Sequence, residues 1–268
     1  MENKFKLGVI GAGFMATAIV KGAIKCGAVS KEQIIVSDVN EQSLNNIAKN
    51  GVNTTLDSKE LVNNSEFVLF AVKPQSLSEV LNVISDCECK KFISIMAGVK
   101  KDRIKNAIKG AKVARCMPNT PCSIGEGAVG LDVSDFEDEN DALFVKSVLS
   151  SFAEVVEVTE DKMHAVTGVS GSSPAYFYLF VKGVIDAGVE AGLDYETSKK
   201  LAVATMVGAG EMVKSNPDKS LDELINAVCS KGGTTIEAVK VYEQSGLSDI
   251  TKNAVNACIK RSKELESL

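Results

Sequence analysis

The chain has 268 residues, of which 45% are hydrophobic and 24% are charged, and its formal net charge is −5. This composition is typical of a globular protein with enough mass for two domains, and the acidic balance argues against a nucleic-acid partner. No apolar run reaches membrane-spanning length and the first residues are not those of a signal peptide, so we expect a cytoplasmic protein with no membrane segment.

The first stretch of the chain, residues 6–10, is an apolar run that leads into the turn Gly11-Ala-Gly13-Phe-Met-Ala16. In a strand–turn–helix unit, Gly11 permits a tight turn and Gly13 lets the backbone approach a pyrophosphate. Ala16 lets the new helix pack against its strand, and the helix N-terminus offers N–H groups to the phosphates. The pattern predicts a dinucleotide site.

A second strand-like run, residues 33–37, places Asp38 about twenty residues after the loop, where a carboxylate bonds the ribose of a dinucleotide. A glycine-rich turn in some other α/β protein is the alternative. The strand, the helix and the acid around the loop favour the dinucleotide site.

Strand-like runs alternate with amphipathic stretches up to about residue 160, which predicts an α/β fold with a Rossmann-type, doubly wound sheet. Further strands are expected over 52–55, 67–72, 91–96, 112–117, 127–133 and 154–159. Ligands of open α/β sheets bind beyond the carboxyl ends of the strands, so the exits at residues 72, 96 and 117 should surround the nicotinamide. Lys73 could reach phosphate or ribose there, although a lysine at the start of a loop is more often solvated.

From about residue 162 no strand-like run appears, and we expect four or five helices. The division is therefore a dinucleotide-binding domain, residues 1–161, and an all-helical dimerisation and substrate-binding domain, residues 162–268. The helix that begins near Pro174 is apolar almost all round, which predicts that a second subunit covers it. Burial against the first domain alone is the alternative.

Two glycine-containing segments of the helical half could bind a ligand. Residues 168–176 lead into the Pro174 helix, and free N–H groups at its start could face a ligand. A flexible connection between the two domains is the alternative. Residues 230–235 combine two glycines, hydroxyl groups and a helix start, which suits a carboxylate. A simple glycine turn with an N-cap threonine is the alternative there.

The seven cysteines are scattered without metal-ligand spacing, so we expect free thiols and no metal site. His164 is the only histidine, and a solvated or capping role is expected for it. A chain with one histidine favours a reduction that needs little acid–base help.

In these motifs the chain resembles the pyrroline-5-carboxylate reductases over essentially its whole length. The matching segments are 11–16, 71–74, 97–99, 117–121 with 125–127, 171–176 and 232–235. The resemblance implies reduction of 1-pyrroline-5-carboxylate to proline with NADPH or NADH. It also implies a homodimer of interleaved C-terminal helices, often assembled further into a decameric ring of dimers.

The resemblance also implies roles for individual residues. In the carboxylate cradle lie Ser230, Gly232, Gly233 and Thr234, and the Thr235 hydroxyl bonds the ring nitrogen as the catalytic group. The implied cofactor contacts are Gly11, Ala12, Gly13, Phe14, Met15, Ser37, Asp38, Asn40, Ala71, Val72, Lys73, Pro74, Ala97 and Asn119. Hydride transfer to a protonated or hydrogen-bonded imine requires no side-chain base, so positioning can supply the catalysis.

Three departures from the family pattern stand out. Ser173 replaces a glycine, which matters only where positive φ is required. Lys231 replaces a proline and is expected to point to water. Asp38-Val39-Asn40 lacks the basic residue that many relatives carry, and an acid at this position repels a 2′-phosphate, which leaves the NADPH preference open.

Two other functions are compatible with parts of the sequence. The β-hydroxyacid dehydrogenase motif, laid on Gly168, needs lysine and asparagine where Phe177 and Val181 stand, and we reject it. A non-catalytic dinucleotide sensor is the other rival, and Thr235 argues against it because a sensor needs no hydroxyl directed at an imine.

Overall fold

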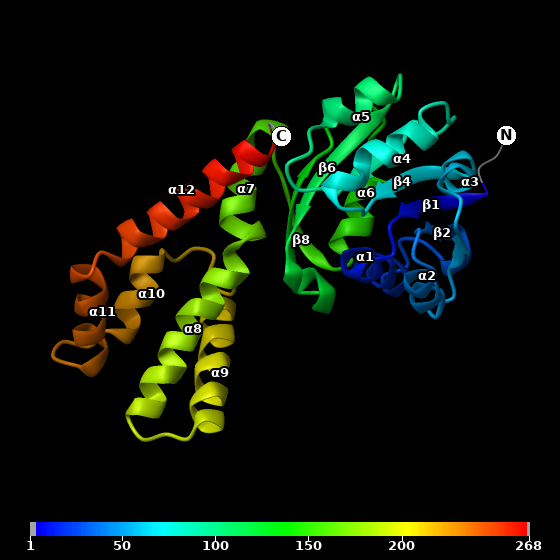
Figure 1. Cartoon of the computed structure of the whole chain (residues 1–268). Coiled ribbons are helices and arrows are strands. Elements are labelled where there is room, and N and C mark those ends of the chain that lie inside the picture. Colours follow the sequence, from blue (N-terminus) through cyan, green and yellow to red (C-terminus); the bar gives the residue numbers. More distant parts are fainter. Residues whose placement is uncertain (1–3, 267–268) are drawn as a thin grey trace. The chain divides into compact units, whose positions relative to one another are not determined.

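The computed structural model describes residues 4–266 (Figure 1). Its first half is built on a sheet whose strands lie in the order β3-β2-β1-β4-β5-β6-β7-β8. Neighbouring strands are parallel except β6 and β7, which pair antiparallel. The strands are β1 (Phe5–Ile10), β2 (Ile34–Ser37), β3 (Asn53–Thr55), β4 (Ser65–Phe70), β5 (Lys91–Ser94), β6 (Lys112–Pro118), β7 (Gly127–Asp132) and β8 (Ala153–Glu157).

Helices cover both faces of this sheet, and alternate strand residues enter two separate cores. Leu7 and Phe67 join a core with α1, α2 and α6, whereas Val68 and Phe92 join a core with α3, α4 and α5. The helices are α1 (Phe14–Lys25), α2 (Glu41–Ala48), α3 (Ser58–Asn63), α4 (Leu77–Ile84), α5 (Lys101–Ala107) and α6 (Glu139–Ser150). The Rossmann-type, doubly wound sheet expected from the sequence is confirmed.

The second half is helical, as expected. Its helices are α7 (Met163–Val166), α8 (Ser173–Glu190), α9 (Tyr195–Lys214), α10 (Leu221–Val228), α11 (Thr234–Gln244) and α12 (Leu247–Glu266). At the start of α10, Ser220 and Glu223 form a capping box. No helix within residues 4–266 combines the length and apolar character that a membrane crossing requires.

The chain divides into two compact units, and the division differs from the boundary between residues 161 and 162 that we expect from the sequence. The first unit runs to Ser172 and resumes at Cys258, and the second is residues 173–257. The difference arises because α7 and the last turns of α12 bond to one another and to the sheet. Cys258 Sγ lies 3.2 Å from Ser172 Oγ, so the chain leaves and re-enters the first unit at neighbouring positions.

The second unit has a small core of its own. Val181, Ile185 and Ala202 are its buried apolar residues, with Met206 packed against them. On α8, by contrast, Phe177 is 60% exposed and Leu179 is 73% exposed. A single chain therefore leaves much of the apolar α8 surface uncovered.

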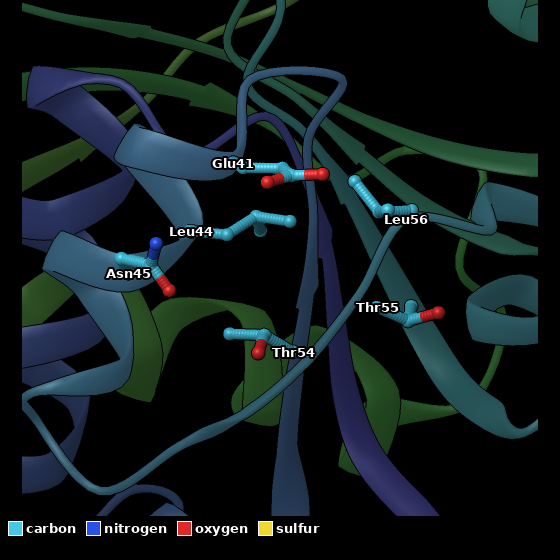
Figure 2. A pocket seen from close by; sticks show the side chains of 6 residues that line it. All are labelled: Glu41, Leu44, Asn45, Thr54, Thr55 and Leu56. Atoms are coloured by element: carbon cyan, nitrogen blue, oxygen red, sulfur yellow. The ribbon is translucent and has the colours of Figure 1, made fainter.

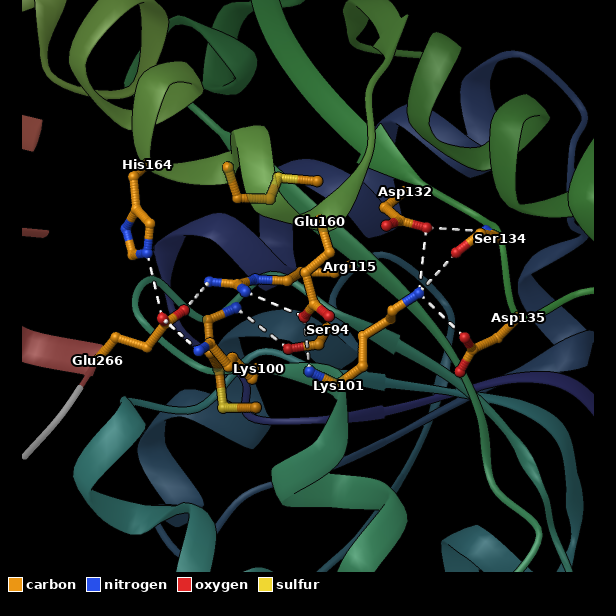
Figure 3. Close-up of polar contacts among 12 residues, drawn as sticks. Ser94, Lys100, Lys101, Arg115, Asp132, Ser134, Asp135, Glu160, His164 and Glu266 are labelled. Atoms are coloured by element: carbon orange, nitrogen blue, oxygen red, sulfur yellow. Dashed lines mark hydrogen bonds and ion pairs between the residues drawn. The ribbon is translucent and has the colours of Figure 1, made fainter. Parts of the chain in front are cut away.

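Glu266, near the end of α12, is anchored in the first unit by three basic side chains (Figure 3). Its carboxylate lies 3.1 Å from Arg115 Nη2, 3.0 Å from Lys100 Nζ and 3.1 Å from His164 Nε2. His164 also bonds Ser262 through Nδ1, at 2.9 Å. The solvated or capping role expected for His164 is therefore wrong: its side chain is only 12% exposed and holds the last turns of α12.

Burial raises the pKa of Glu266, but hydrogen bonds from Lys100, His164 and Arg115 outweigh that effect and hold its pKa below the usual 4.5. A depressed folded-state pKa stabilises the fold above the unfolded-state pKa, and the stabilisation is lost as pH falls through the folded value.

We therefore expect Glu266→Gln to lower the free energy of unfolding at pH 7 by about 2 kcal/mol, since the buried Arg115 loses one of its two carboxylate partners. Below pH 4.5 the difference from the unsubstituted chain should shrink. Urea denaturation at several pH values measures this. The matched control is Glu264→Gln, an exposed acid two residues away, and an equal loss in both variants would contradict the anchoring role of Glu266.

Candidate functional site

The glycine loop after β1 requires a glycine at its first position. Gly11 has φ +106°, and a Cβ built on it would lie 2.6 Å from the carbonyl oxygen of Ala71. Its N–H donates to the Ser37 carbonyl at 2.7 Å. The loop therefore turns tightly between the ends of β2 and β4, and only a residue without a side chain fits there.

Gly13 differs, because the protein places no atom within 4 Å of a Cβ built on it. Its φ of −75° is open to any residue. Neither packing nor backbone conformation explains this glycine, whereas close approach of a phosphate does. Gly13 is also the N-cap of α1 and provides no side-chain cap, so N–H groups of the first turn remain available to an anion.

Asp38 follows β2 and lies directly beside this loop. Its Oδ2 accepts a hydrogen bond from the Ala12 N–H at 2.7 Å, and its Oδ1 accepts one from the Asn40 N–H at 2.9 Å. Asn40 caps α2 by accepting from the Ser43 N–H. The structure thus brings the predicted loop and the predicted acid together.

Two other residues predicted to contact the cofactor have side chains that make hydrogen bonds within the protein. Ser37 is fully buried, and its hydroxyl lies 3.1 Å from that of Ser58. Asn119 accepts from the Ala128 N–H at 3.0 Å and donates to the Ser170 carbonyl at 3.3 Å. Asn119 therefore braces the loop after β6, a role that the sequence analysis missed because its partners are distant in the chain.

The remaining predicted cofactor residues lie at the carboxyl edge of the sheet. Phe14 is 69% exposed at the start of α1. Lys73 and Ala97 are exposed, and Lys73 immediately precedes a 3₁₀ turn that begins at Pro74. The residues placed at this edge are Met15, Ala71, Val72 and Pro74.

The segment 168–176 leads into a helix, as expected: α8 begins at Ser173, one residue before Pro174. A π-helical turn, Thr167–Gly171, follows α7 and leads into α8, and the Ser172 N–H donates to the Thr167 carbonyl at 2.9 Å. The small residues before α8 therefore form a π-helical turn that continues α7. Within residues 4–266 only glycines have positive φ, so Ser173 causes no backbone strain.

The glycine segment before α11 does form a helix start. Gly232 has φ +74°, and a Cβ on Gly233 would meet Ser230 Oγ at 2.3 Å. Gly233, not a threonine, is the N-cap, and it provides no side-chain cap. Thr234 and Thr235 are the first two residues of α11, so their N–H groups have no acceptor within the helix and could bind an anion. Lys231 is exposed, as expected.

Among the described residues, no group of three or more His, Cys, Asp or Glu side chains is placed to hold a metal ion. All seven cysteines are free. Burial raises the pKa of the Cys89 thiol to about 11, which makes it a poor nucleophile.

Comparison with known proteins places these features in a known context. Residues 160–265 match the family model for pyrroline-5-carboxylate reductase dimerisation, and residues 6–98 match that for NADP oxidoreductase, coenzyme F420-dependent. The pyrroline-5-carboxylate reductase of Haemophilus influenzae is 39% identical, with 100% of both chains covered. That of Arabidopsis thaliana is 34% identical over 98% of this chain and 96% of its own.

Two solved structures are similar over nearly the whole chain. A pyrroline-5-carboxylate reductase from Coxiella burnetii superposes with a TM-score of 0.92 at 33% identity, covering 98% of this chain and 99% of its own. The Plasmodium falciparum pyrroline carboxylate reductase with NADP bound gives 0.85 at 31% identity, covering 99% of each.

Proposed function

The chain belongs to the pyrroline-5-carboxylate reductase family, and from this premise we propose that it reduces 1-pyrroline-5-carboxylate to L-proline, the last step of proline biosynthesis. The hydride comes from NADPH or NADH. The observation that carries the proposal is full-length similarity to named reductases, in a chain that has both a dinucleotide loop and a glycine-tipped helix start.

The bound nicotinamide nucleotide supplies the hydride. The residues of the first unit hold it: N–H groups at the start of α1 bind the pyrophosphate, and Asp38 bonds a ribose. Lys73 and Ala97 belong to the edge of the sheet where the nicotinamide end is expected. Asn119 keeps the loop after β6 in place through its bonds to Ala128 and Ser170.

The residues of the second unit hold the substrate. The Ser230 hydroxyl and the N–H groups of Gly232, Gly233 and Thr234 bind its carboxylate. The Thr235 hydroxyl bonds the ring nitrogen and so orients the imine carbon toward the hydride. No side chain has to remove a proton, which agrees with a chain whose one histidine anchors α12.

The second unit is also the assembly surface in this proposal. The exposed apolar side chains of α8 and the match to a dimerisation model support a homodimer, with a ring of five dimers as the larger assembly. The seven free thiols suit a reducing compartment, and we place the protein in the cytoplasm.

The test is an assay of the purified chain. Adding 1-pyrroline-5-carboxylate to the protein and reduced nucleotide should lower the absorbance of the reduced nicotinamide. One proline should form for each nucleotide oxidised. Sedimentation equilibrium should give at least twice the chain mass. A protein that binds nucleotide but leaves it unoxidised would be the sensor considered above, and the proposed function would be wrong.

A further inference from the structure

The orientation of Asp38 bears on which nucleotide the enzyme uses. Both carboxylate oxygens accept backbone hydrogen bonds, one from each side of the turn, at 2.7 and 2.9 Å. These bonds hold the carboxylate beside the glycine loop, where it cannot swing away from an incoming group. The fixed negative charge therefore lies where the adenosine ribose of a dinucleotide binds.

A pocket of about 270 Å³ opens three residues beyond Asp38, between the start of α2 and the end of β3. Figure 2 shows Glu41 and Leu44 of α2 facing Leu56 across it. The lining residues are Glu41, Leu44, Asn45, Thr54, Thr55 and Leu56. Within the described chain the lining thus includes an acid and no base.

A 2′-phosphate requires a cation, because it carries close to two negative charges. Three lysines near Asp38 in the chain lie elsewhere or have other partners. Lys31 precedes β2, whereas Asp38 follows it, Lys49 bonds Asn46 at 3.2 Å, and Lys59 pairs with Asp86 at 2.7 Å. Lys73 follows β4, which β1 separates from β2. Two strand spacings are roughly 10 Å, so Lys73 lies nearer the pyrophosphate than the far side of the ribose.

We propose that this chain selects NADH over NADPH, and that Asp38, supported by Glu41, is the specificity-determining residue. Asp38 accepts bonds from the ribose hydroxyls of NADH and repels the 2′-phosphate of NADPH. The proposal rests on the proposed function and deepens it. It sets this chain apart from the Plasmodium relative, whose structure holds NADP.

The decisive variant adds a cation and leaves Asp38 in place, because Asp38 also braces the loop. Val39 is 96% exposed, so Val39→Arg should not disturb folding. The matched control is Val83→Arg on α4, half exposed, which adds the same charge away from the nucleotide. Isothermal titration calorimetry measures the dissociation constants of NADH and NADPH for each protein.

The unsubstituted chain should bind NADH at least about tenfold more tightly than NADPH, a difference of about 1.4 kcal/mol. Val39→Arg should tighten NADPH binding about tenfold and leave NADH binding within about twofold, as expected for one charged hydrogen bond. Glu41→Gln should also tighten NADPH binding relative to NADH binding, by a smaller factor than Val39→Arg. Val83→Arg should change neither constant.

The outcomes separate this inference from the proposed function. Equal or tighter binding of NADPH by the unsubstituted chain would overturn the selectivity while the reductase assay still succeeds. An equal gain with Val39→Arg and Val83→Arg would show that net charge, not position, sets the preference. Failure to bind either nucleotide would overturn both proposals.

Discussion

A Thr235→Val substitution is expected to lower kcat for pyrroline-5-carboxylate reduction by about a hundredfold, the usual cost of removing one aligned hydrogen-bond donor from a reacting centre. Thr235 is the second residue of α11, in a turn that Gly232 and Gly233 shape. Valine keeps the volume and branching of threonine and removes only the hydroxyl. The dissociation constant of the nucleotide should stay within about threefold, because Thr235 lies outside the first unit.

Steady-state kinetics and calorimetry on the same preparations measure both quantities. Thr235→Ser should retain most of the turnover, since serine keeps the hydroxyl. Thr234→Val should leave turnover largely intact, because in the proposed site Thr234 binds the substrate carboxylate through its backbone N–H and not through its side chain. Parallel loss of turnover and nucleotide affinity in Thr235→Val would remove Thr235 from the substrate site.

Gly11→Ala is expected to abolish nucleotide binding and to lower the free energy of unfolding by about 3 kcal/mol, combining a left-handed backbone with a steric clash. The clash is with backbone: the new Cβ would lie 2.6 Å from the Ala71 carbonyl oxygen. The loop and the end of β4 would have to separate, which also disturbs the hydrogen bond from Gly11 to Ser37.

Gly13→Ala is the matched comparison, because the protein leaves open space at that Cβ. We expect it to fold with near-normal stability and to bind nucleotide at least about tenfold more weakly, since the methyl group meets the phosphate. Urea denaturation and calorimetry measure the pair. Similar stability losses in both variants would mean that the two glycines serve one structural purpose.

Much of the architecture could be predicted because it depends on local patterns. Apolar runs that alternate with amphipathic stretches predicted the strands of the sheet, and the lack of strand-like runs after residue 162 predicted the helical half. Strand β4 ends at Phe70, two residues earlier than expected, because apolar character continues into Ala71 and Val72 after the pairing has ended.

Contacts between residues distant in sequence could not be predicted in this way. Ser262 and Glu266 lie about a hundred residues beyond His164, and no periodicity connects them. The π-helical turn before α8 was missed for a related reason: its small residues resemble a loop, and Asn119 reaches it only because the sheet brings them together. Which polar group meets which depends on the completed fold.

The neighbouring positions of Ser172 and Cys258 make the helical unit an insertion in a single nucleotide-binding body. Because the two ends of this insertion lie side by side, another sequence could replace residues 173–257 without changing any strand pairing. Residues 173–257 can therefore change in sequence while the strands of the first unit stay the same. It also means that proteolytic excision of residues 173–257 would leave the last turns of α12 held only by their side chains, Glu266 foremost.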